Sequence, residues 1–226
     1  MSDTGLRERK RRRMYQSVSD IAIGLFLEKG FDAVSVAEVA AAAEISKPTL
    51  FRYFPSKEDL VLHRFADHET EAARVVEEGR AAGRSPIDAL REHFLDGLRR
   101  EDPVTGLNEH PGILAFHRLL YGTPSLVARM YGYLERSEAA LADALAKPLG
   151  AGLDARLAAG QITAVRRILA EENLRRIAEG ERVAAVRPDA VAAAERAFAQ
   201  LAAGFPGLAR SAHSGTARPT PEMHPG

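Results

Sequence analysis

Residues 35–57 read SVAEVAAAAEISKPTLFRYFPSK, and this stretch decides the fold expected for the chain. Ser35 is followed three residues later by Glu38, and this pair forms a capping box that starts a short amphipathic helix. Ser46 suits the N-cap of a second short helix, because its hydroxyl can accept a backbone N–H and Pro48 is tolerated in the first turn. A tight turn separates the two helices, so the stretch predicts a helix-turn-helix.

A run of positive charge precedes this motif, since residues 7–13 read RERKRRR, with six Lys or Arg against one Glu. The whole chain carries no net charge at pH 7, so affinity for a polyanion has to come from this local concentration. We expect residues 1–13 to form a basic N-terminal arm in which Arg11, Arg12 and Arg13 contact phosphates. Most charge runs are simply solvated, but an arm placed before a helix-turn-helix indicates DNA binding.

The composition excludes several other classes of protein. The chain has 226 residues, 46% of them hydrophobic, which is enough for a sizeable core. It has no cysteine, which excludes disulfides, cysteine-bound zinc, iron–sulfur clusters and a cysteine nucleophile. We find neither a signal peptide nor an apolar run of membrane-spanning length, and we expect a cytoplasmic protein with no membrane partner.

Apolar residues recur at helical spacing through the rest of the chain, while strand signals are almost absent. The expected fold is therefore all-α, with about nine helices. The segment AAGRSP at 81–86 breaks the pattern, and the tail at 207–226 is expected to be disordered because it contains little apolar sequence. The expected helices span about 14–29, 35–43, 46–54, 56–80, 85–101, 113–121, 124–147, 154–179 and 188–205.

The second helix of such a motif enters the major groove, and its N-terminal residues reach base edges. Lys47 can donate to guanine acceptors and Phe51 can contact a thymine methyl, whereas a tyrosine hydroxyl or a lysine ammonium farther along suits phosphate. Leu50 and Phe54 are expected to face inward. The residues of this motif expected to contact DNA are Ser35, Ser46, Lys47, Pro48, Thr49, Phe51, Tyr53 and Lys57.

Residues 18–62 resemble the DNA-binding domain of the TetR family of bacterial one-component regulators. The matching pattern is LFLEKGFDAVSVAEVAAAAEISKPTLFRYFPSKEDL. The resemblance implies a helix-turn-helix domain at 14–60 and a helical ligand-binding and dimerisation domain at 61–206. One departure is Glu44, where the family most often has Gly, and this position is expected to need a strained turn. Another is Phe51, which is often Tyr in the family.

The resemblance also implies a function: a repressor that binds a palindromic operator on double-stranded DNA as a homodimer and is released by a small, largely apolar ligand. Aromatic and histidine side chains in the three central helices combine apolar bulk with polar tips, as ligand pockets do. A packed core would use the same residue types. The residues expected to line a pocket are His93, Phe94, Phe116, His117, Tyr121, Met130, Tyr131 and Tyr133.

The last two helices are expected to form the dimer interface, because both carry apolar faces with small residues that allow close approach. Phe198 is taken as part of that face, although the same residues could serve the core of the monomer. The histidines have no metal-ligand spacing, so we expect no metal and no cofactor.

Three other functions compete with this interpretation. An enzyme is disfavoured because the chain lacks a phosphate-binding Gly-rich loop, an HExxH motif and a recognisable carboxylate pair. An architectural DNA-binding protein would bind with strong salt dependence and little sequence preference. A ligand-blind dimeric regulator would use its C-terminal domain for dimerisation alone.

Overall fold

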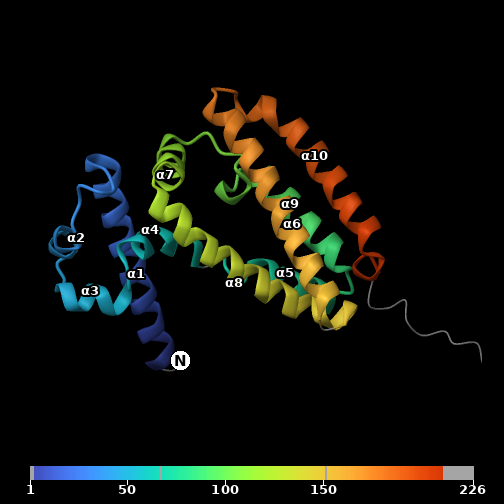
Figure 1. Ribbon diagram of the computed structural model, residues 1–226, viewed down its shortest axis with the longest axis horizontal. Helices are drawn as coiled ribbons and strands as arrows, with labels where there is room; N and C mark the ends of the chain where they lie inside the picture. Colours follow the sequence, from blue (N-terminus) through green and yellow to red (C-terminus); the bar gives the residue numbers. More distant parts are fainter. Residues whose placement is uncertain (1–2, 67, 151, 211–226) are drawn as a thin grey trace, which may run out of the picture.

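The computed structural model describes residues 3–66, 68–150 and 152–210 (Figure 1). Within these ranges the chain forms ten α-helices and two short 3₁₀ helices, with no strand. The all-α expectation is confirmed, and the described part holds one helix more than the nine expected. The helices are α1 Asp3–Lys29, α2 Val36–Ala42, α3 Lys47–Tyr53, α4 Lys57–Ala66, α5 Glu71–Ala81, α6 Pro86–Arg100, α7 Pro111–Gly122, α8 Pro124–Leu149, α9 Leu153–Ala178 and α10 Val183–Gly204, with 3₁₀ turns at Pro103–Thr105 and Pro206–Leu208.

The basic run at 7–13 is not a separate arm, because α1 is continuous from Asp3 to Lys29. Arg, Lys and Glu all have good intrinsic helix propensity, so the run extends the helix that the apolar pattern starts at Met14. The positive charge therefore sits on the first turns of a helix that projects from the N-terminal domain (Figure 1).

Helices α1 to α4 share one core, in which Phe26, Leu50 and Leu60 are fully buried. Leu120 of α7 belongs to the same core. A buried hydrogen bond joins α1 to α4, because the Ser19 hydroxyl donates to the Leu60 carbonyl at 2.7 Å. The helix-turn-helix is thus packed onto α1 and α4, and through α4 and α7 it contacts the rest of the molecule.

The single helix expected at 56–80 is wrong, since the chain forms α4 and α5 with a turn between them. The His68 N–H donates to the Phe65 carbonyl, and Thr70 has a non-helical conformation just before α5. The break redirects α5 so that it packs against α6 and α8 and buries its own apolar face, including Val76. This tertiary burial outweighs the local helix propensity at the break, where residues 66–70 (ADHET) include neither Gly nor Pro.

A second, larger core lies among α5, α6, α8, α9 and α10. Phe198 is 0% exposed and its ring packs against Phe94, 6.1 Å between centroids. Phe198 therefore belongs to the core of the chain, which corrects its assignment to an outer interface. Helices α9 and α10 lie side by side at one edge of the molecule (Figure 1).

Helix α10 begins at Val183, five residues before the expected start at Pro188. The Glu109 carboxylate accepts a hydrogen bond from the Val183 N–H at 3.0 Å and satisfies one free donor of the first turn. The expected tail also begins too early, because Leu208 is 0% exposed. The rest of that tail, 211–226, lies outside the described residues. In the described part, every helix is too short or too polar to span a bilayer.

Candidate DNA interface and ligand cavity

Both helices of the helix-turn-helix are capped as their sequences predict. The Ser35 hydroxyl accepts the Glu38 N–H at 3.1 Å, and the Ser46 hydroxyl accepts the Thr49 N–H at 3.2 Å. The hydroxyls of Ser46 and Thr49 also lie 2.8 Å apart in a hydrogen bond. These caps fix where α2 and α3 begin, and hence which side chains α3 presents to solvent.

The turn between α2 and α3 places Glu44 at φ 54°, in the left-handed region. This confirms that the residue replacing glycine there adopts a strained conformation, which costs about 1–2 kcal/mol for a residue with a Cβ. The Glu44 side chain is exposed beside the start of α3.

Helix α3 has a buried and an exposed side. Leu50 is 1% exposed and Phe54, its C-cap, 2%, so both face inward as expected. Lys47, Pro48 and Phe51 are exposed, and the Lys47 ammonium lies 5.9 Å from the centre of the Phe51 ring.

Arg52 adds a basic group that the sequence interpretation missed. It is exposed on α3, and its guanidinium lies 5.2 Å from the centre of the Tyr53 ring. The Tyr53 ring in turn packs edge-on against Tyr15 of α1, with 5.0 Å between centroids. The exposed side of α3 therefore carries two cations and two aromatic rings, one of which is anchored to α1. The signal was available in the sequence, because Arg52 lies between two residues already assigned to the interface.

Lys57 does not face outward with these groups. Its ammonium donates to the Phe31 carbonyl and lies 4.3 Å from the centre of the Phe31 ring. This contact engages the ammonium within the domain, with a partner 26 residues away that the local pattern did not reveal. On α1, Arg11 and Arg13 are exposed, whereas the Arg12 side chain lies outside the described residues.

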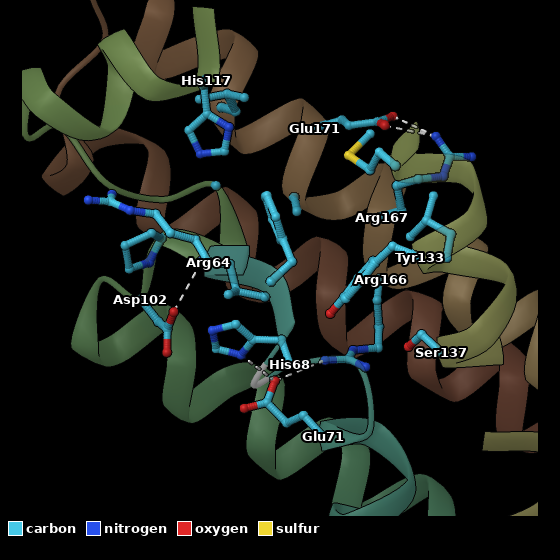
Figure 2. A pocket seen from close by; sticks show the side chains of 18 of the residues that line it. Arg64, His68, Glu71, Asp102, His117, Tyr133, Ser137, Arg166, Arg167 and Glu171 are labelled. Atoms are coloured by element: carbon cyan, nitrogen blue, oxygen red, sulfur yellow. Dashed lines mark hydrogen bonds and ion pairs between the residues drawn. The ribbon is translucent and has the colours of Figure 1, made fainter. Parts of the chain in front are cut away.

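A cavity of about 390 Å³ lies between the helix-turn-helix core and the C-terminal helices (Figure 2). Its walls come from α1, α4, the turn after α4, α5, α6, the segment 102–106 and α7 to α9. Most of the lining is apolar, and aromatic rings from Phe65, Phe94, Phe116 and Tyr133 form much of it. Phe65 packs 6.0 Å from Phe116 and 5.7 Å from Tyr133, measured between ring centroids.

The structure brings together six of the eight side chains expected at a pocket, and leaves two outside the cavity. Tyr131 is 64% exposed on α8, because it lies on the helix face opposite the lining residue Tyr133. His93 does not line the cavity, but its Nε2 lies 3.6 Å from a Glu71 carboxylate oxygen. The six that line the cavity are Phe94, Phe116, His117, Tyr121, Met130 and Tyr133.

A cluster of charged groups at one end of the cavity was missed from sequence. Glu71 lies 3.3 Å from His68 Nδ1 and 4.0 Å from the Arg166 guanidinium (Figure 2). Burial alone would raise the pKa of the Glu71 carboxyl, but the adjacent imidazoles of His68 and His93 outweigh it and hold that pKa well below its usual range. Glu71 is therefore an anion with three cationic or potentially cationic neighbours. The members of this cluster come from the turn after α4, from α5, from α6 and from α9, so no local sequence motif could predict it.

Arg166 is the least satisfied member of this cluster. Its side chain is 19% exposed, and burial lowers the pKa of its guanidinium. Across the described residues its sole close counter-charge is Glu71, at 4.0 Å, and its guanidinium makes no hydrogen bond. A planar group with five donors thus lines the cavity with those donors unused.

At the other side of the cavity in Figure 2, His117 contributes a second unsatisfied polar atom. Its buried Nδ1 has no hydrogen-bond partner in the described part of the chain. Burial lowers the pKa of His117, so the neutral imidazole is favoured. The ring stacks on Tyr121, 6.0 Å between centroids and 8° between planes, which fixes its orientation.

The segment 102–106 closes one side of the cavity and is held tightly against α9. The Asn173 amide donates to the Thr105 carbonyl at 2.9 Å. Gly106, at φ 71°, lies so close to α9 that a Cβ built on it would be 1.9 Å from the Ala170 carbonyl oxygen. The position and the conformation of this wall therefore both require glycine.

Comparison with known proteins bears on both sites. Residues 19–63 match the family described as bacterial regulatory proteins, tetR family. The chain is 34% identical over 154 residues to the HTH-type transcriptional regulator TcmR of Streptomyces glaucescens, a match that covers 66% of each chain. It is 43% identical over 60 residues to the putative mycofactocin biosynthesis transcriptional regulator MftR of Mycobacterium tuberculosis, covering 26% of this chain and 30% of that one. The matches thus span about two thirds of the first relative and less than a third of the second.

Solved structures share the fold over nearly the whole chain. Thermus thermophilus FadR, a TetR family transcriptional repressor in complex with lauroyl-CoA, has a TM-score of 0.52 at 22% identity, covering 93% of this chain and 100% of that one. NalD of Pseudomonas aeruginosa, the secondary repressor of the MexAB-OprM multidrug efflux pump, has a TM-score of 0.53 at 19% identity, covering 88% and 98%. The chain belongs to the TetR family of DNA-binding transcriptional regulators.

Proposed function

We propose that this chain is a ligand-responsive transcriptional regulator and not an enzyme: a repressor that binds a palindromic operator as a homodimer and leaves it when a small molecule fills the cavity. The observation that carries the proposal is the shared wall of that cavity. Gln16 of α1 and Arg64 of α4 line it together with residues of α6 to α9. A ligand there contacts the helices that hold the DNA reader and the helices of the C-terminal core at once.

The coupling would run through α4. This helix is tied to α1 by the Ser19 hydrogen bond and by the Arg64–Asp20 ion pair at 3.0 Å. Two recognition helices of a dimer have to match half-sites about 34–36 Å apart. A ligand that binds better to a state with a different spacing therefore releases the DNA, by as much as its preference for that state.

On the DNA side, we propose that α3 reads base edges with Lys47, Pro48, Thr49 and Phe51, and that Arg52 and Tyr53 bind phosphates. The first turns of α1, with Arg11 to Arg13, would supply phosphate contacts that raise affinity for all sequences. Ser35 and Ser46 would place the backbone N–H groups of their helix starts near phosphate. Lys57 is left out because its ammonium is used within the domain.

The dimer interface that we propose is the outer face of α9 and α10. Leu157 is 48% exposed, Ile168 55% and Val191 36%, and they are accompanied by exposed alanines of α10. An Ile168→Asp variant should shift the chain from dimer to monomer in light scattering. Tyr131→Asp is the matched control, because Tyr131 is 64% exposed, against 55% for Ile168, but lies on α8.

Capture of genomic DNA fragments by the purified protein tests the DNA-binding function. We expect a small set of fragments that share an inverted repeat, bound tightly at physiological salt. Uniform capture of unrelated fragments with a steep salt dependence would favour an architectural protein. A specific operator whose affinity is unchanged in Ser137→Trp, a variant that fills the cavity, and that no small molecule releases would favour a ligand-blind regulator.

A further inference from the structure

We propose that the ligand of this cavity is an aromatic carboxylic acid whose carboxylate binds Arg166. The inference rests on the proposed ligand response, and it adds the chemical class of the ligand. Three features of the described residues support it: a largely buried arginine side chain without hydrogen bonds, an aromatic lining, and an unpartnered imidazole nitrogen.

A largely buried arginine without hydrogen-bond acceptors is costly, because its donors lose water and gain no partner. Most of the Arg166 side chain is removed from solvent without gaining a hydrogen bond, and its nearest carboxylate oxygen is 4.0 Å away. A carboxylate presents two acceptor oxygens in the plane that the guanidinium fork matches, and this bidentate pair is among the strongest hydrogen-bonded contacts. A ligand carboxylate would therefore satisfy donors that the protein leaves unused.

Glu71 does not exclude this anion, because it has other partners. Its carboxylate lies 3.3 Å from His68 and 3.6 Å from His93, on the turn after α4 and on α6. Arg166 approaches from α9 and is the most distant of the three neighbours, at 4.0 Å (Figure 2). The two imidazoles are therefore the main partners of Glu71. The two imidazoles leave the guanidinium available to a second carboxylate.

The remainder of the cavity favours a ring system over a flexible chain. Phe65, Phe94, Phe116 and Tyr133 come from four different elements and surround the space with ring faces and edges. Ring faces attract the edges of other rings, at centroid distances of about 4.5–7 Å. His117 Nδ1 adds a site for one hydroxyl or carbonyl group on the ligand. The volume of about 390 Å³ is sufficient for a few fused rings.

The test uses three fluorescent probes of one shape: anthracene-2-carboxylate, anthracene-2-carboxamide and 2-(aminomethyl)anthracene. Binding to the full-length protein is followed by titration calorimetry and fluorescence. We expect the carboxylate to bind at least about tenfold more tightly than the neutral amide, as a charge-assisted contact requires. Equal or tighter binding of the amide or the amine, or no binding of the carboxylate at 1 mM, would overturn the proposal.

Variants assign the effect to Arg166. Arg166→Gln should remove the preference for the carboxylate over the amide, and Arg166→Lys should retain part of it. Arg175→Gln is the control, because Arg175 lies on the same helix but is exposed and does not line the cavity. Circular dichroism establishes that each variant is folded, and the wild-type probe series decides the outcome even where Arg166→Gln fails to fold. A preference that survives in a folded Arg166→Gln variant would contradict the proposal.

Release of DNA is measured separately on the captured operator. A carboxylate that binds through Arg166 without lowering operator affinity would refute the proposed ligand response and leave the ligand class standing. Operator release by the neutral or cationic probes alone would support the proposed ligand response and refute the proposed ligand class.

Discussion

Gly106→Ala tests whether the wall at 102–106 is set by its contact with α9. The new Cβ would lie 1.9 Å from the Ala170 carbonyl oxygen and 3.0 Å from the Leu174 amide nitrogen, so the segment has to move away from α9. The left-handed φ of 71° costs an alanine about 1–2 kcal/mol, and forcing atoms into a packed site costs about 1–3 kcal/mol. We expect the free energy of unfolding to fall by about 2–5 kcal/mol.

The assay is urea unfolding followed by circular dichroism, at one fixed protein concentration because dimerisation makes stability depend on concentration. Gly180→Ala is the matched control. Gly180 has φ 100°, but a Cβ there meets no atom within 4 Å, so this variant bears the backbone strain alone, about 1–2 kcal/mol. Equal destabilisation of the two variants would refute the argument, because it would show that the contact with α9 contributes nothing beyond the backbone conformation.

Three further variants test other parts of the structure. Ser19→Ala leaves the buried Leu60 carbonyl without its 2.7 Å hydrogen bond, so unfolding free energy should fall by about 1–3 kcal/mol, and an unchanged urea midpoint would count against the bond. Glu44→Gly relieves the strain at φ 54° but increases the conformational entropy of the unfolded chain, so stability should change by less than about 1 kcal/mol. Its affinity for the operator in a gel-shift assay should rise, because a negative charge is removed from the DNA-facing turn. Weaker binding would contradict this. Burial lowers the pKa of His117 in the folded state, so the unfolded chain binds more protons there and stability should fall as pH drops below about 6.5. In His117→Gln the melting temperature should depend less on pH over that window, and an identical pH dependence in the two proteins would refute the assignment.

The parts of the fold predicted correctly from sequence depend on local signals. Ser35 and Ser46 act three residues along the chain, and their caps set the helix-turn-helix starts as expected. The strain at Glu44 also follows from local backbone geometry, since the turn requires a positive φ whatever residue occupies it. Leu50 faces inward because helical spacing alone determines which side of α3 is apolar.

The candidate sites were only partly predictable. The aromatic and histidine residues of the central helices suggested Phe94 and Phe116 as pocket residues, and both line the cavity. Arg166 carried no signal, because a charged residue on an arginine-rich helix normally points to solvent. The intramolecular partner of Lys57, the Phe31 carbonyl, carried no local signal either, because it lies 26 residues away.

The sequence by itself determined the all-α class, the reading motif and its caps, because each depends on interactions within a few residues along one helix or turn. The tertiary structure decided the rest. Helix α4 ends where it does because the turn that follows lets α5 bury its apolar face. Helix α10 begins at Val183 because the Glu109 carboxylate, 74 residues away, accepts the hydrogen bond of the Val183 N–H. The tertiary structure also placed Glu71 and Arg166 at the same end of one cavity. Burial and long-range hydrogen bonds set these features, and their free energies exceed the helix propensities that a local pattern records.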